Sequence, residues 1–427
     1  KVKVSDSGRN HAHASIDWLN AMNVETEFGC HSEQFFSSID LVMLSPGVPY
    51  TLPIFDFARA NGVPVYGELA LAPCYLKTPM IAITGTNGKT TTTTLIGDIL
   101  KANDKQVFVG GNIGTPLTDY LIGDQDADWV VLEVSSFQLD TAGAFKPEIG
   151  VLLNITPDHL DRYDSMKEYA LSKLHLFTYQ GADDGAIFNA DDPVINSIIE
   201  DTNCIQKGWA KRGTVSFGNT AKCDGHAFYT ESGIRFSLAN RTQLFDLSGT
   251  VFSFFPNKEN AAAAIVACSM AGCSAAAIVE ATKQFTPLAH RMTLVRECKG
   301  VHYINDSKAT NTGAVEAALK AFSKPIILIA GGRHKGGEFE RLREVVSAKV
   351  RYMLLIGEAK ELMAQKFETL TTIELCSTLL AAVLRAQELS VPGDVVLFSP
   401  ACASFDMFSS YVHRGEVFEQ IVAELVD

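Results

Sequence analysis

A chain of 427 residues is longer than one hydrophobic core usually supports, so we expect two or three domains. Its 36 Lys and Arg residues are outnumbered by 49 Asp and Glu residues, which gives a formal net charge of −13 without any basic block. That balance argues against nucleic acid or an anionic membrane as a partner, although it is compatible with a local cationic pocket for a phosphorylated ligand.

Nine cysteines are scattered along the chain without a C-x-x-C pair, as expected of free thiols in a reducing cytoplasm, and they give little support to a zinc site or a disulfide framework. Residues 261–279 carry no charge, but they are rich in Ala, Ser and Gly, so we expect a closely packed buried helix rather than a membrane span. The chain begins without Met on what looks like the end of a strand, so we expect it to start within a domain.

The first part of the chain predicts a small α/β unit. A hydrophobic strand and a Pro-Gly turn fall within 41–49, a helix that stops at glycine within 54–62, and a further apolar run within 63–71. Helix-breaking residues within 71–79 indicate a linker. We therefore expect a first domain over residues 1–73.

A larger second domain is expected over residues 74–287. Its predicted strands lie within 80–83, 129–136, 149–155 and 185–192. Short polar–apolar alternations over 203–255 predict hairpins, and an alanine-rich helix over 259–283 closes the domain. Strands that alternate with amphipathic helices are typical of a parallel sheet with crossover connections.

The remaining residues, 288–427, predict a third domain of the same α/β class. Its predicted strands lie within 301–307, 325–332, 350–357 and 394–401. A helical pattern follows each of them, so a second open α/β sheet is expected.

The segment PMIAITGTNGKTTTTTLIGDIL is similar to a phosphate-binding loop but does not complete the pattern G-x-x-x-x-G-K-[ST], because Ile83 stands where the first glycine falls. Gly85 and Gly88 remain, between a buried strand and a helix, so backbone N–H groups and the helix N-terminus would cradle a polyphosphate. Lys89 would neutralise phosphate charge and Thr90 would ligate Mg²⁺. The alternative is a glycine turn capped by threonines.

Two polar residues follow other predicted strands. Glu133 ends the strand in VVLEVSSFQLD, at the sheet edge where α/β proteins bind ligands, and could hold Mg²⁺; a solvated strand end is the alternative. His159 in NITPDHLDRY could reach a metal or a phosphate. Its alternative is an ordinary helix start, with Thr156 as N-cap and Pro157 at the first position, which leaves the histidine unexplained.

Lys173 lies in a helix that is otherwise apolar on that face, so its sequence context alone favours a snorkelling lysine. The segment PNKEN at 256–260 resembles the guanine-reading N-K-x-D motif, but Asn260 replaces the aspartate. An Asn side chain both donates and accepts, which suits the N6/N7 edge of adenine, so ATP is favoured over GTP.

Three polar loops follow strands in the last third of the chain: INDSKATN, AGGRHKGGEF and SPACASFD. Loops at one edge of one sheet predict a cleft, which would offer a small anion the side chains of Lys308, Thr310, Lys335 and Ser404. Turn chemistry and helix caps are the alternative for each loop alone.

Together these segments resemble the Mur ligase family. The family's short phosphate loop T-G-T-N-G-K-[ST] stands at 84–90, and GGNIG, LEVSSFQL, DHLDRY, the HR pair at 290–291, NDSKATN and SPACAS follow in the family's order. The resemblance covers essentially the whole chain, and the last two motifs look like the branch that adds D-glutamate. It implies a Rossmann-like UDP-binding domain that is incomplete at its start, a central P-loop ATPase-like domain and a C-terminal Rossmann-like domain.

The resemblance implies ATP and Mg²⁺ as cofactors, with two metal ions. It implies these residues for ATP: Gly85, Thr86, Asn87, Gly88, Lys89, Thr90, Thr91, Asn257, Asn260, Arg291 and Asp306. It implies these for the metal: Thr90, Glu133, His159 and Lys173. Lys173 matches the lysine that the family carbamylates, which would make it a carboxylate-like ligand rather than a snorkelling side chain. Catalysis would rest on Lys89, His159 and Lys173.

Two substrates are implied in the same way. The residues implied for UDP-N-acetylmuramoyl-L-alanine are Ser7, Ser45, Gly47, Asn112 and His159. Those implied for D-glutamate are Lys308, Thr310, Lys335, Ser404 and Tyr411, where the family commonly has Phe at the last position. The segment SDSGR differs from the family's D-T-R uracil contact by an inserted residue, which weakens the assignment of Ser7.

The implied reaction forms an amide bond by way of an acyl phosphate. The chain is then expected to act as a monomer in the bacterial cytoplasm, on small molecules and without nucleic acid or membrane. A sibling ligase for another amino acid and a folylpolyglutamate synthase stay open as alternatives. A nucleotide switch or transport ATPase would need a guanine-reading motif, an ABC-type signature or a partner-facing helix, and the sequence shows none of them.

Overall fold

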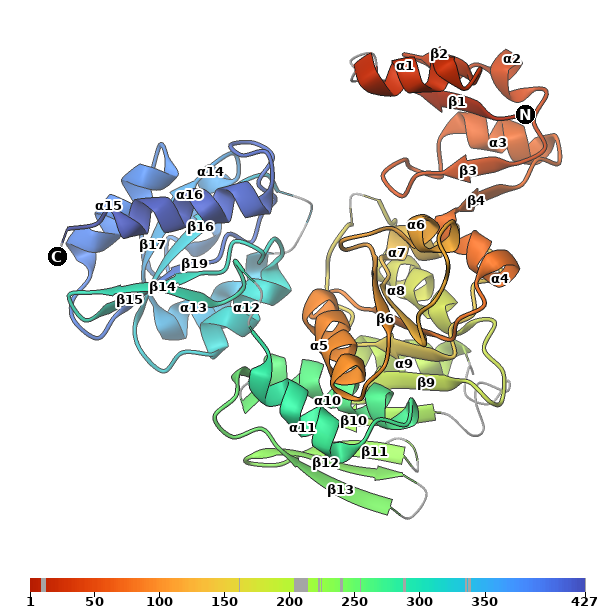
Figure 1. Cartoon of the computed structure of the whole chain (residues 1–427). Helices are drawn as coiled ribbons and strands as arrows, with labels where there is room; N and C mark the ends of the chain where they lie inside the picture. The colour runs from red at the N-terminus through yellow and green to blue at the C-terminus, as the bar shows by residue number, and fades with distance from the viewer. Residues whose placement is uncertain are drawn as a thin grey trace. The chain divides into compact units, whose positions relative to one another are not determined.

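The structure is a computed structural model of the chain (Figure 1), and it describes residues 1–8, 13–160, 162–202, 214–221, 223, 225–238, 241–253, 255–286, 289–334, 336 and 339–426. Lys335, which the sequence assigns to the D-glutamate site, lies outside the described residues. The chain forms two compact units, one of Lys1–Leu76 with Phe137–Phe145 and one of Lys77–Ser136 with Lys146–Asp427. The predicted domain limits at 73/74 and 287/288 stay predictions.

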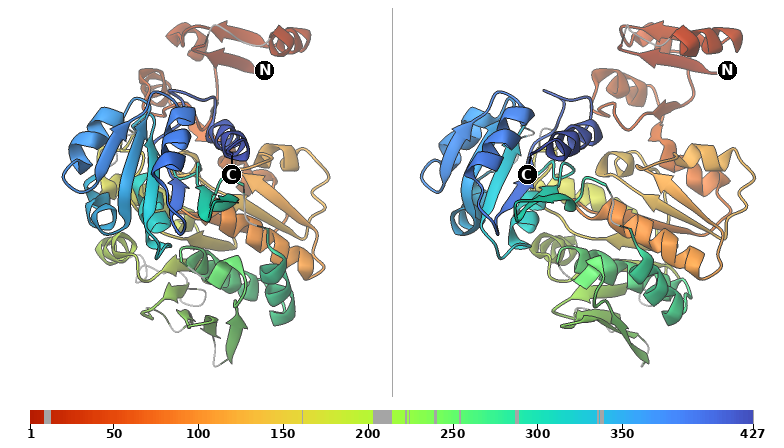
Figure 2. Two further views of the ribbon diagram at one scale, coloured as in Figure 1. Left: turned by 90° about the vertical axis from the view of Figure 1, so that its left-hand side faces the viewer. Right: turned by 60° about the vertical axis from the view of Figure 1, so that its left-hand side comes forward.

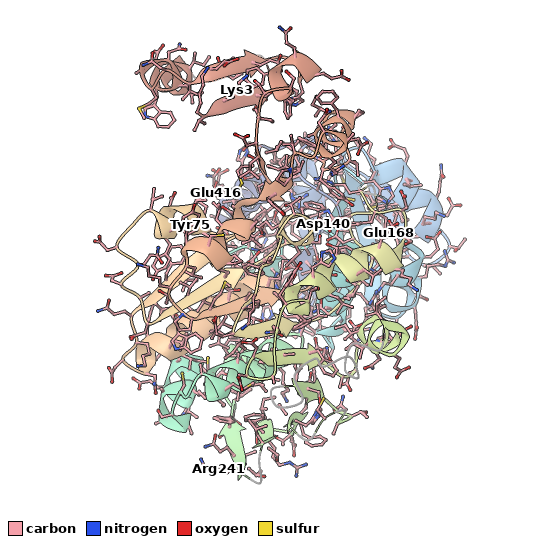
Figure 3. All side chains as sticks on the ribbon, turned by 90° about the vertical axis from the view of Figure 1, so that its right-hand side faces the viewer. Lys3, Tyr75, Asp140, Glu168, Arg241 and Glu416 are labelled. Atoms are coloured by element: carbon pink, nitrogen blue, oxygen red, sulfur yellow. The ribbon has the colours of Figure 1, made fainter. Side chains whose placement is uncertain are left out.

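The first unit is built on two short pairs of parallel strands. These are β1 (Lys3–Asp6) with β2 (Glu25–Phe28), and β3 (Val42–Leu44) with β4 (Val65–Gly67). They are joined by α1 (His13–Ala21), α2 (Glu33–Phe36) and α3 (Pro53–Ala60), and followed by the 3₁₀ turn η1 (Glu68–Leu71) and α4 (Ala72–Tyr75). Lys3, labelled in Figure 3, ties β1 to the end of α2 because its Nζ donates to the Phe35 carbonyl at 3.3 Å.

The segment predicted to be a linker, 71–79, contains α4 instead of an irregular stretch. Pro73 stands in the first turn of that helix, where a missing backbone N–H costs no intrahelical hydrogen bond. Helix-breaking residues therefore mark the start of an element here, not its absence.

A nine-stranded sheet dominates the second unit, with the strand order β13-β12-β11-β10-β9-β8-β5-β7-β6. Its strands are β5 (Met80–Thr84), β6 (Val107–Gly111), β7 (Trp129–Glu133), β8 (Ile149–Leu152), β9 (Gly185–Asn189), β10 (Thr214–Gly218), β11 (Gly225–Tyr229), β12 (Gly233–Leu238) and β13 (Arg241–Asp246). Strands β5 to β11 pair in parallel, and among the described strands of this sheet the antiparallel pairs are β11 with β12 and β12 with β13. The predicted hairpin region is therefore half parallel, since β10 continues the parallel ladder of β9.

Helices α5 (Lys89–Ala102), α10 (Asn257–Met270) and α11 (Ala275–Gln284) pack together beside this sheet and share one core with it. The remaining helices of this part are α6 (Leu117–Leu121), α8 (Met166–Leu174) and α9 (Pro193–Thr202), with 3₁₀ turns η2 (His175–Phe177) and η3 (Val251–Ser253). Helix α7 (Ser136–Leu139) lies almost wholly in the segment Phe137–Phe145 of the first unit. No helix among the described residues is both long and apolar enough to cross a membrane.

The predicted single helix over 259–283 is wrong, because the structure divides it into α10 and α11. Gly272 adopts φ +84°, which ends α10 in a left-handed turn that favours glycine. Ser274 then caps the next helix by accepting a hydrogen bond from the Ala277 N–H. The apolar composition of the segment concealed these two signals.

A six-stranded sheet forms the last part of the second unit, in the order β14-β15-β19-β16-β17-β18. Its strands are β14 (Thr293–Cys298), β15 (Val301–Asn305), β16 (Ile326–Gly331), β17 (Val350–Ile356), β18 (Thr372–Leu375) and β19 (Val395–Phe398). Its helices are α12 (Thr312–Lys320), α13 (Arg343–Lys349), α14 (Lys360–Phe367), α15 (Leu379–Leu389) and α16 (Tyr411–Ala423), with the 3₁₀ turn η4 (Phe339–Leu342). The sequence pattern missed β14 and β18, which lie at the two edges.

Helices cover both faces of this sheet, as Figure 2 shows. Alternate residues of β16 point to opposite cores: Leu328 packs with α12, α13 and α14, and Ile329 packs with α15 and α16. Only β14 runs antiparallel to its neighbour. The predicted α/β class is confirmed, and the carboxyl ends of the parallel strands lie where the polar loops begin.

Candidate active site

The predicted phosphate loop is a strand–turn–helix unit, with β5 leading through Gly85–Gly88 into α5. Gly88 has φ +86°, and a Cβ atom there would lie 2.1 Å from Oδ1 of Asn260. Gly85 has φ +150°, and its Cβ atom would lie 2.9 Å from the Leu153 side chain. Both glycines are required by space as well as by backbone conformation, which favours the cradle over a generic turn.

Lys89 folds back over its own loop, because its Nζ donates to the carbonyls of Gly85 and Thr86, both at 2.9 Å. These bonds hold a cation at the mouth of the turn. Thr91, which the resemblance also implies for ATP, is 3% exposed, so it lies on the buried side of α5.

The loop after β8 supports the phosphate loop from behind. The Asn154 carbonyl accepts from the Thr86 N–H at 2.9 Å, and Asn154 Oδ1 accepts from the Asn87 N–H at 2.8 Å. Asn154 Nδ2 also donates to the Asn87 carbonyl at 3.1 Å. Sequence reasoning missed Asn154, because nothing local to an Asn after a strand indicates a partner 67 residues away.

Glu133 is 3% exposed at the end of β7, so the solvated strand end is wrong. Its Oε1 accepts from Nδ2 of Asn112 at 2.9 Å, whereas Oε2 is buried and has no hydrogen-bond partner among the described residues. An uncompensated buried carboxylate oxygen is costly, so it fits a place where a cation binds. Asn112, assigned to the sugar-peptide substrate, orients this carboxylate in the structure.

His159 lies in a loop, and the alternative of a helix that starts at Thr156 is wrong. Helix α8 begins only at Met166, where Ser165 caps it by accepting from the N–H of Glu168, which Figure 3 labels. His159 has φ +56°, its side chain is 30% exposed, and its Nε2 lies 3.8 Å from Oδ2 of Asp158. The loop thus presents an imidazole outward, beside a buried carboxylate.

Lys173 is 2% exposed, so a snorkelling lysine is also wrong. Its Nζ donates to the Gly85 carbonyl at 3.1 Å and lies 4.6 Å from the centre of the Tyr169 ring. The amine therefore reaches the phosphate loop from α8, although 88 residues separate the two in sequence.

Asn260 lies against the phosphate loop and is 3% exposed. Its Nδ2 donates weakly to Oδ1 of Asn257, at 3.4 Å, within the first turn of α10. The intervening Lys258 points elsewhere and donates to the carbonyls of Thr230 and Glu231. Asn260 thus stands beside the glycine turn, with the Asn257 amide next to it, and both side chains can donate and accept hydrogen bonds.

Lys308 reaches the phosphate loop from the six-stranded sheet, with its Nζ 3.0 Å from Oγ1 of Thr90. The phenol oxygen of Tyr411 lies 3.5 Å from the same Nζ. Burial, together with nearby Arg291, lowers the pKa of Lys308 to about 8. Two residues predicted for different ligands, Thr90 and Lys308, therefore belong to one site.

Arg291 and Asp306 are two further buried, ionisable side chains near Lys308. Burial lowers the pKa of Arg291, and its Nε is buried without a hydrogen-bond partner among the described residues. Asp306 accepts from the Ser399 hydroxyl at 2.8 Å and from the Met292 N–H at 3.2 Å, yet burial raises its pKa to about 7. A guanidinium nitrogen without a partner among the described residues, beside Lys308, suits an anionic ligand on electrostatic grounds.

Arg414 is a residue that sequence reasoning missed. It is 1% exposed in α16 and donates to the hydroxyl and carbonyl of Ser307, at 3.0 and 2.8 Å, and to the Cys402 carbonyl at 3.0 Å. It thereby joins the loops that carry Lys308 and Ser404. A lone Arg in an amphipathic helix usually lies on the surface, so no local pattern indicates this role.

The other predicted residues differ in how far the structure brings them to this site. Ser404 is 2% exposed beside the Cys402 loop, and Thr310 is half-buried next to Lys308. Ser7, Ser45 and Gly47 are exposed and belong to the first unit, at the end of β1 and in the turn after β3. Among the described residues, no three His, Cys, Asp or Glu side chains converge as a ready-made metal site.

Two family models match the chain. The model of the Mur ligase middle domain matches residues 83–268, and the model described as "Mur ligase, glutamate ligase domain" matches residues 290–402. The chain belongs to the Mur ligase family of ATP-dependent ligases.

Relatives of known name cover nearly all of the chain. A protein of Syntrophotalea carbinolica is 40% identical over 99% of this chain and 92% of its own length. One of Geotalea uraniireducens is 41% identical over 100% of this chain and 93% of its own length. Both are named UDP-N-acetylmuramoylalanine--D-glutamate ligase.

Solved structures share the fold at low sequence identity. A pseudomurein peptide ligase type C from Methanothermus fervidus is 19% identical, with a TM-score of 0.63 over 98% of this chain and 94% of its own. MurF ligase from Thermotoga maritima in complex with ADP is 21% identical, with a TM-score of 0.61 over 86% of this chain and 91% of its own. These likenesses support the α/β architecture.

Proposed function

We propose that the chain joins D-glutamate to the L-alanine carboxylate of UDP-N-acetylmuramoyl-L-alanine at the expense of ATP, as a step of peptidoglycan precursor synthesis in the bacterial cytoplasm. The observation that best supports this proposal is the 3.0 Å contact between Lys308, which is proposed to bind the amino acid, and Thr90 of the phosphate loop. The names of relatives about 40% identical over the whole chain support this choice of substrates. We propose that it acts as a monomer on these small molecules alone.

The chemistry explains why a nucleotide and an amino acid share a site. A carboxylate is a poor electrophile, and its oxygen is a poor leaving group. In the proposed route, a carboxylate oxygen attacks the γ-phosphorus of ATP, the bond to the β-phosphate oxygen breaks, and ADP leaves. The amine of D-glutamate then attacks the carbonyl carbon, phosphate leaves from the tetrahedral intermediate, and the amine loses a proton.

The described side chains suit the negative charge that builds up along this route. Lys89 stands at the mouth of the phosphate loop, and Lys308 stands beside Thr90. Arg291 offers a buried Nε with no partner among the described residues. Cations fixed in a partly buried site stabilise developing charge more strongly than water does, because they need not reorganise during the reaction.

The residues present also fit a divalent cation. Thr90 and the open Oε2 of Glu133 would hold one Mg²⁺, and His159 with a modified Lys173 would hold a second. When bound, the metal would neutralise phosphate charge. Until then Glu133 is held in position by Asn112, whose amide occupies only one of its two oxygens.

Carbamylation of Lys173 is compatible with its surroundings. The modified nitrogen keeps one N–H, which could still donate to the Gly85 carbonyl as Nζ does now. The added carboxylate group would replace a cation by an anion beside the phosphate loop. That reversal of charge would supply the acidic ligand that the described residues lack at this point.

The D-glutamate site is proposed at Lys308, Thr310, Lys335, Ser404 and Tyr411. Lys308 and Tyr411 are already in contact, and Arg414 holds the loops that carry Lys308 and Ser404. D-glutamate has two carboxylates, which lysine ammonium groups and hydroxyl donors can bind. Water must be kept from the acyl phosphate until the amine of D-glutamate attacks it.

An amino-acid panel tests the proposal. The purified chain would be given ATP, Mg²⁺, UDP-N-acetylmuramoyl-L-alanine and one of D-glutamate, L-alanine, L-lysine or diaminopimelate, and ADP release would be followed. We expect the highest kcat/KM with D-glutamate and a product heavier by one glutamyl residue. Best turnover with another amino acid, or with a folate acceptor in place of the UDP-sugar, would refute it.

A further inference from the structure

Asn311 uses one side chain to join three different segments. Its Oδ1 accepts from the Ala314 N–H at 2.8 Å and thus caps α12. Its Nδ2 donates to Oδ1 of Asn87 at 3.2 Å and to Oδ2 of Asp158 at 3.0 Å. Three of the four hydrogen bonds that an Asn side chain can make are therefore occupied, and the residue is only 8% exposed.

The two acceptors stand next to residues proposed for catalysis, and Asn87 is itself one of the residues implied for ATP. Asn87 directly precedes Gly88 and Lys89 in the phosphate loop. Asp158 directly precedes His159, and its Oδ1 accepts from the His159 N–H at 3.0 Å. Asn311 thus reaches both sides of the site through one –NH₂ group.

The start of α12 is packed against the same loops. A Cβ atom on Gly313 would lie 2.8 Å from Oγ1 of Thr156 and 3.3 Å from Nδ2 of Asn87. A glycine at this position lets the first turn of α12 approach the loop after β8 closely. This approach is what brings the Asn311 amide within reach of Asp158.

We propose that Asn311 is a positioning residue that sets the backbone of His159 and the phosphate loop through its donor group, so that α12 aligns the activating machinery when it packs there. The inference rests on the proposed function for its effect on catalysis, and on geometry alone for its effect on the loops. A cap alone would need only the acceptor Oδ1. The two donor bonds have no part in capping and point to a second role.

Aspartate at this position would separate the two roles. Asn311→Asp keeps an oxygen that can cap α12, because Asp and Asn are equally good N-caps. It replaces the donor by a second oxygen, which would face the Asp158 carboxylate and repel it. Asn311→Ser keeps a capping hydroxyl and removes the donors without adding charge. Thr378→Ala is the matched control, since it removes the cap of α15, which lies on the opposite face of the six-stranded sheet.

Kinetics with the proposed substrates give the first measurement. We expect Asn311→Ser and Asn311→Asp to lower kcat about 10- to 100-fold, as small misplacements of reacting groups do, while the Kd of a non-hydrolysable ATP analogue changes less than about threefold. Thr378→Ala should leave kcat unchanged. A kcat of Asn311→Ser within about twofold of the parent would show that Asn311 is only a cap.

The reciprocal exchange sharpens the test. In Asn311→Asp combined with Asp158→Asn, the donor moves to position 158 and the acceptor to position 311, so the hydrogen bond is restored in reverse. We expect the kcat of this double variant to be at least about tenfold higher than that of Asn311→Asp alone, as for coupled neighbours. If the fold-loss of kcat in the double variant equals the product of the losses in Asn311→Asp and Asp158→Asn, a direct interaction is contradicted.

A measurement without substrates keeps the inference independent of the proposed reaction. Hydrogen exchange of the backbone amides in 154–160 should become several-fold faster in Asn311→Ser and stay unchanged in Thr378→Ala. Unchanged exchange in both variants would overturn the positioning role. If instead the parent fails to use D-glutamate while Asn311→Ser loosens this loop, the proposed function falls and the positioning role stands.

Discussion

Lys89 bridges two carbonyls of its own loop, so its position is set before a nucleotide binds. Removing the charge while keeping the length of the side chain, as in Lys89→Met, should lower kcat at least about 100-fold, because one preorganised electrostatic contact at a developing charge is worth that much. Steady-state ADP release would measure the loss. Lys101→Met, at the exposed far end of the same helix, is the control and should retain the parent rate; equal rates for both variants would contradict the role of Lys89.

At Lys173 the question is whether catalysis needs the negative charge of a carbamate or the positive charge of the unmodified amine. Lys173→Arg keeps a cation that could donate to the Gly85 carbonyl, but a guanidinium would not form the carbamate. We expect a loss of kcat of about 100-fold or more if a carboxylate-like ligand is needed there. Lys167→Arg, on the exposed side of α8, should be neutral. Full activity of Lys173→Arg would mean that the unmodified ammonium suffices.

At this scale the motifs predicted several side chains that the structure brings together, such as Thr90 and Lys308, and the local pattern misjudged several environments. It located Lys89, Thr90, Glu133 and Lys308 because motif spacing fixes them relative to strand ends. Patterns within one helix could not show that Lys173 is buried, since its partner Gly85 comes from a distant segment. The same limit applies to Arg414, whose two loops are joined only by the fold.

The phosphate loop as an element depends on a glycine that cannot be replaced. Gly88→Ala would place a Cβ atom 2.1 Å from Oδ1 of Asn260 and also strain a backbone at φ +86°. Gly249→Ala is a matched control, because Gly249 has φ +73° but no atom within 4 Å of the added carbon. Both should lose stability by about 1 kcal/mol from backbone strain, but only Gly88→Ala should lose binding of an ATP analogue. Equal affinities, measured by calorimetry, would contradict this view of the loop.

Glu259 in helix α10 lowers the stability of the fold by an amount that depends on pH. Burial, with Asp191 and Asp192 nearby, raises the pKa of Glu259 to about 7. Between the usual value near 4.5 and about 7, the folded state holds a proton that the unfolded state has lost, so this residue makes the fold less stable as pH rises.

The variant Glu259→Gln removes that cost. Its Tm should exceed the parent's by an amount that grows from pH 5 to pH 7 and is constant above, on the order of a few degrees at the plateau. Glu280→Gln, at an exposed position on α11, controls for the loss of one negative charge. An advantage that shrinks as pH rises would reverse the sign and contradict the assignment.

Elements with strong periodicity were predicted well, and those governed by single residues were not. The runs of β5, β7 and β16 are almost entirely buried, so they read as nearly continuous apolar stretches. The break between α10 and α11 depends on Gly272 and Ser274 within an otherwise uniform alanine-rich segment. Edge strands β14 and β18 have more exposed patterns, which gave them no clear signal.

For the molecule as a whole, α/β class and the order of its parts followed from the alternation of strands and helices. The contacts that join those parts did not. Asn311 and Asp158 are 153 residues apart, and Lys308 and Thr90 are 218 residues apart. Such pairs arise because parallel strands bring their carboxyl ends together, and a single sequence does not show which loops then meet.

The central claim is that the phosphate loop makes a carboxylate reactive before the amine arrives. Positional isotope exchange tests it most directly. ATP labelled with ¹⁸O in the bridge between the β- and γ-phosphates would be incubated with the protein, Mg²⁺ and UDP-N-acetylmuramoyl-L-alanine, without D-glutamate. Reversible acyl-phosphate formation frees the β-phosphate of ADP to rotate, so the account predicts that label moves to non-bridging positions only when the UDP-sugar peptide is present. Absence of exchange, in a preparation that forms the amide once D-glutamate is added, would contradict it.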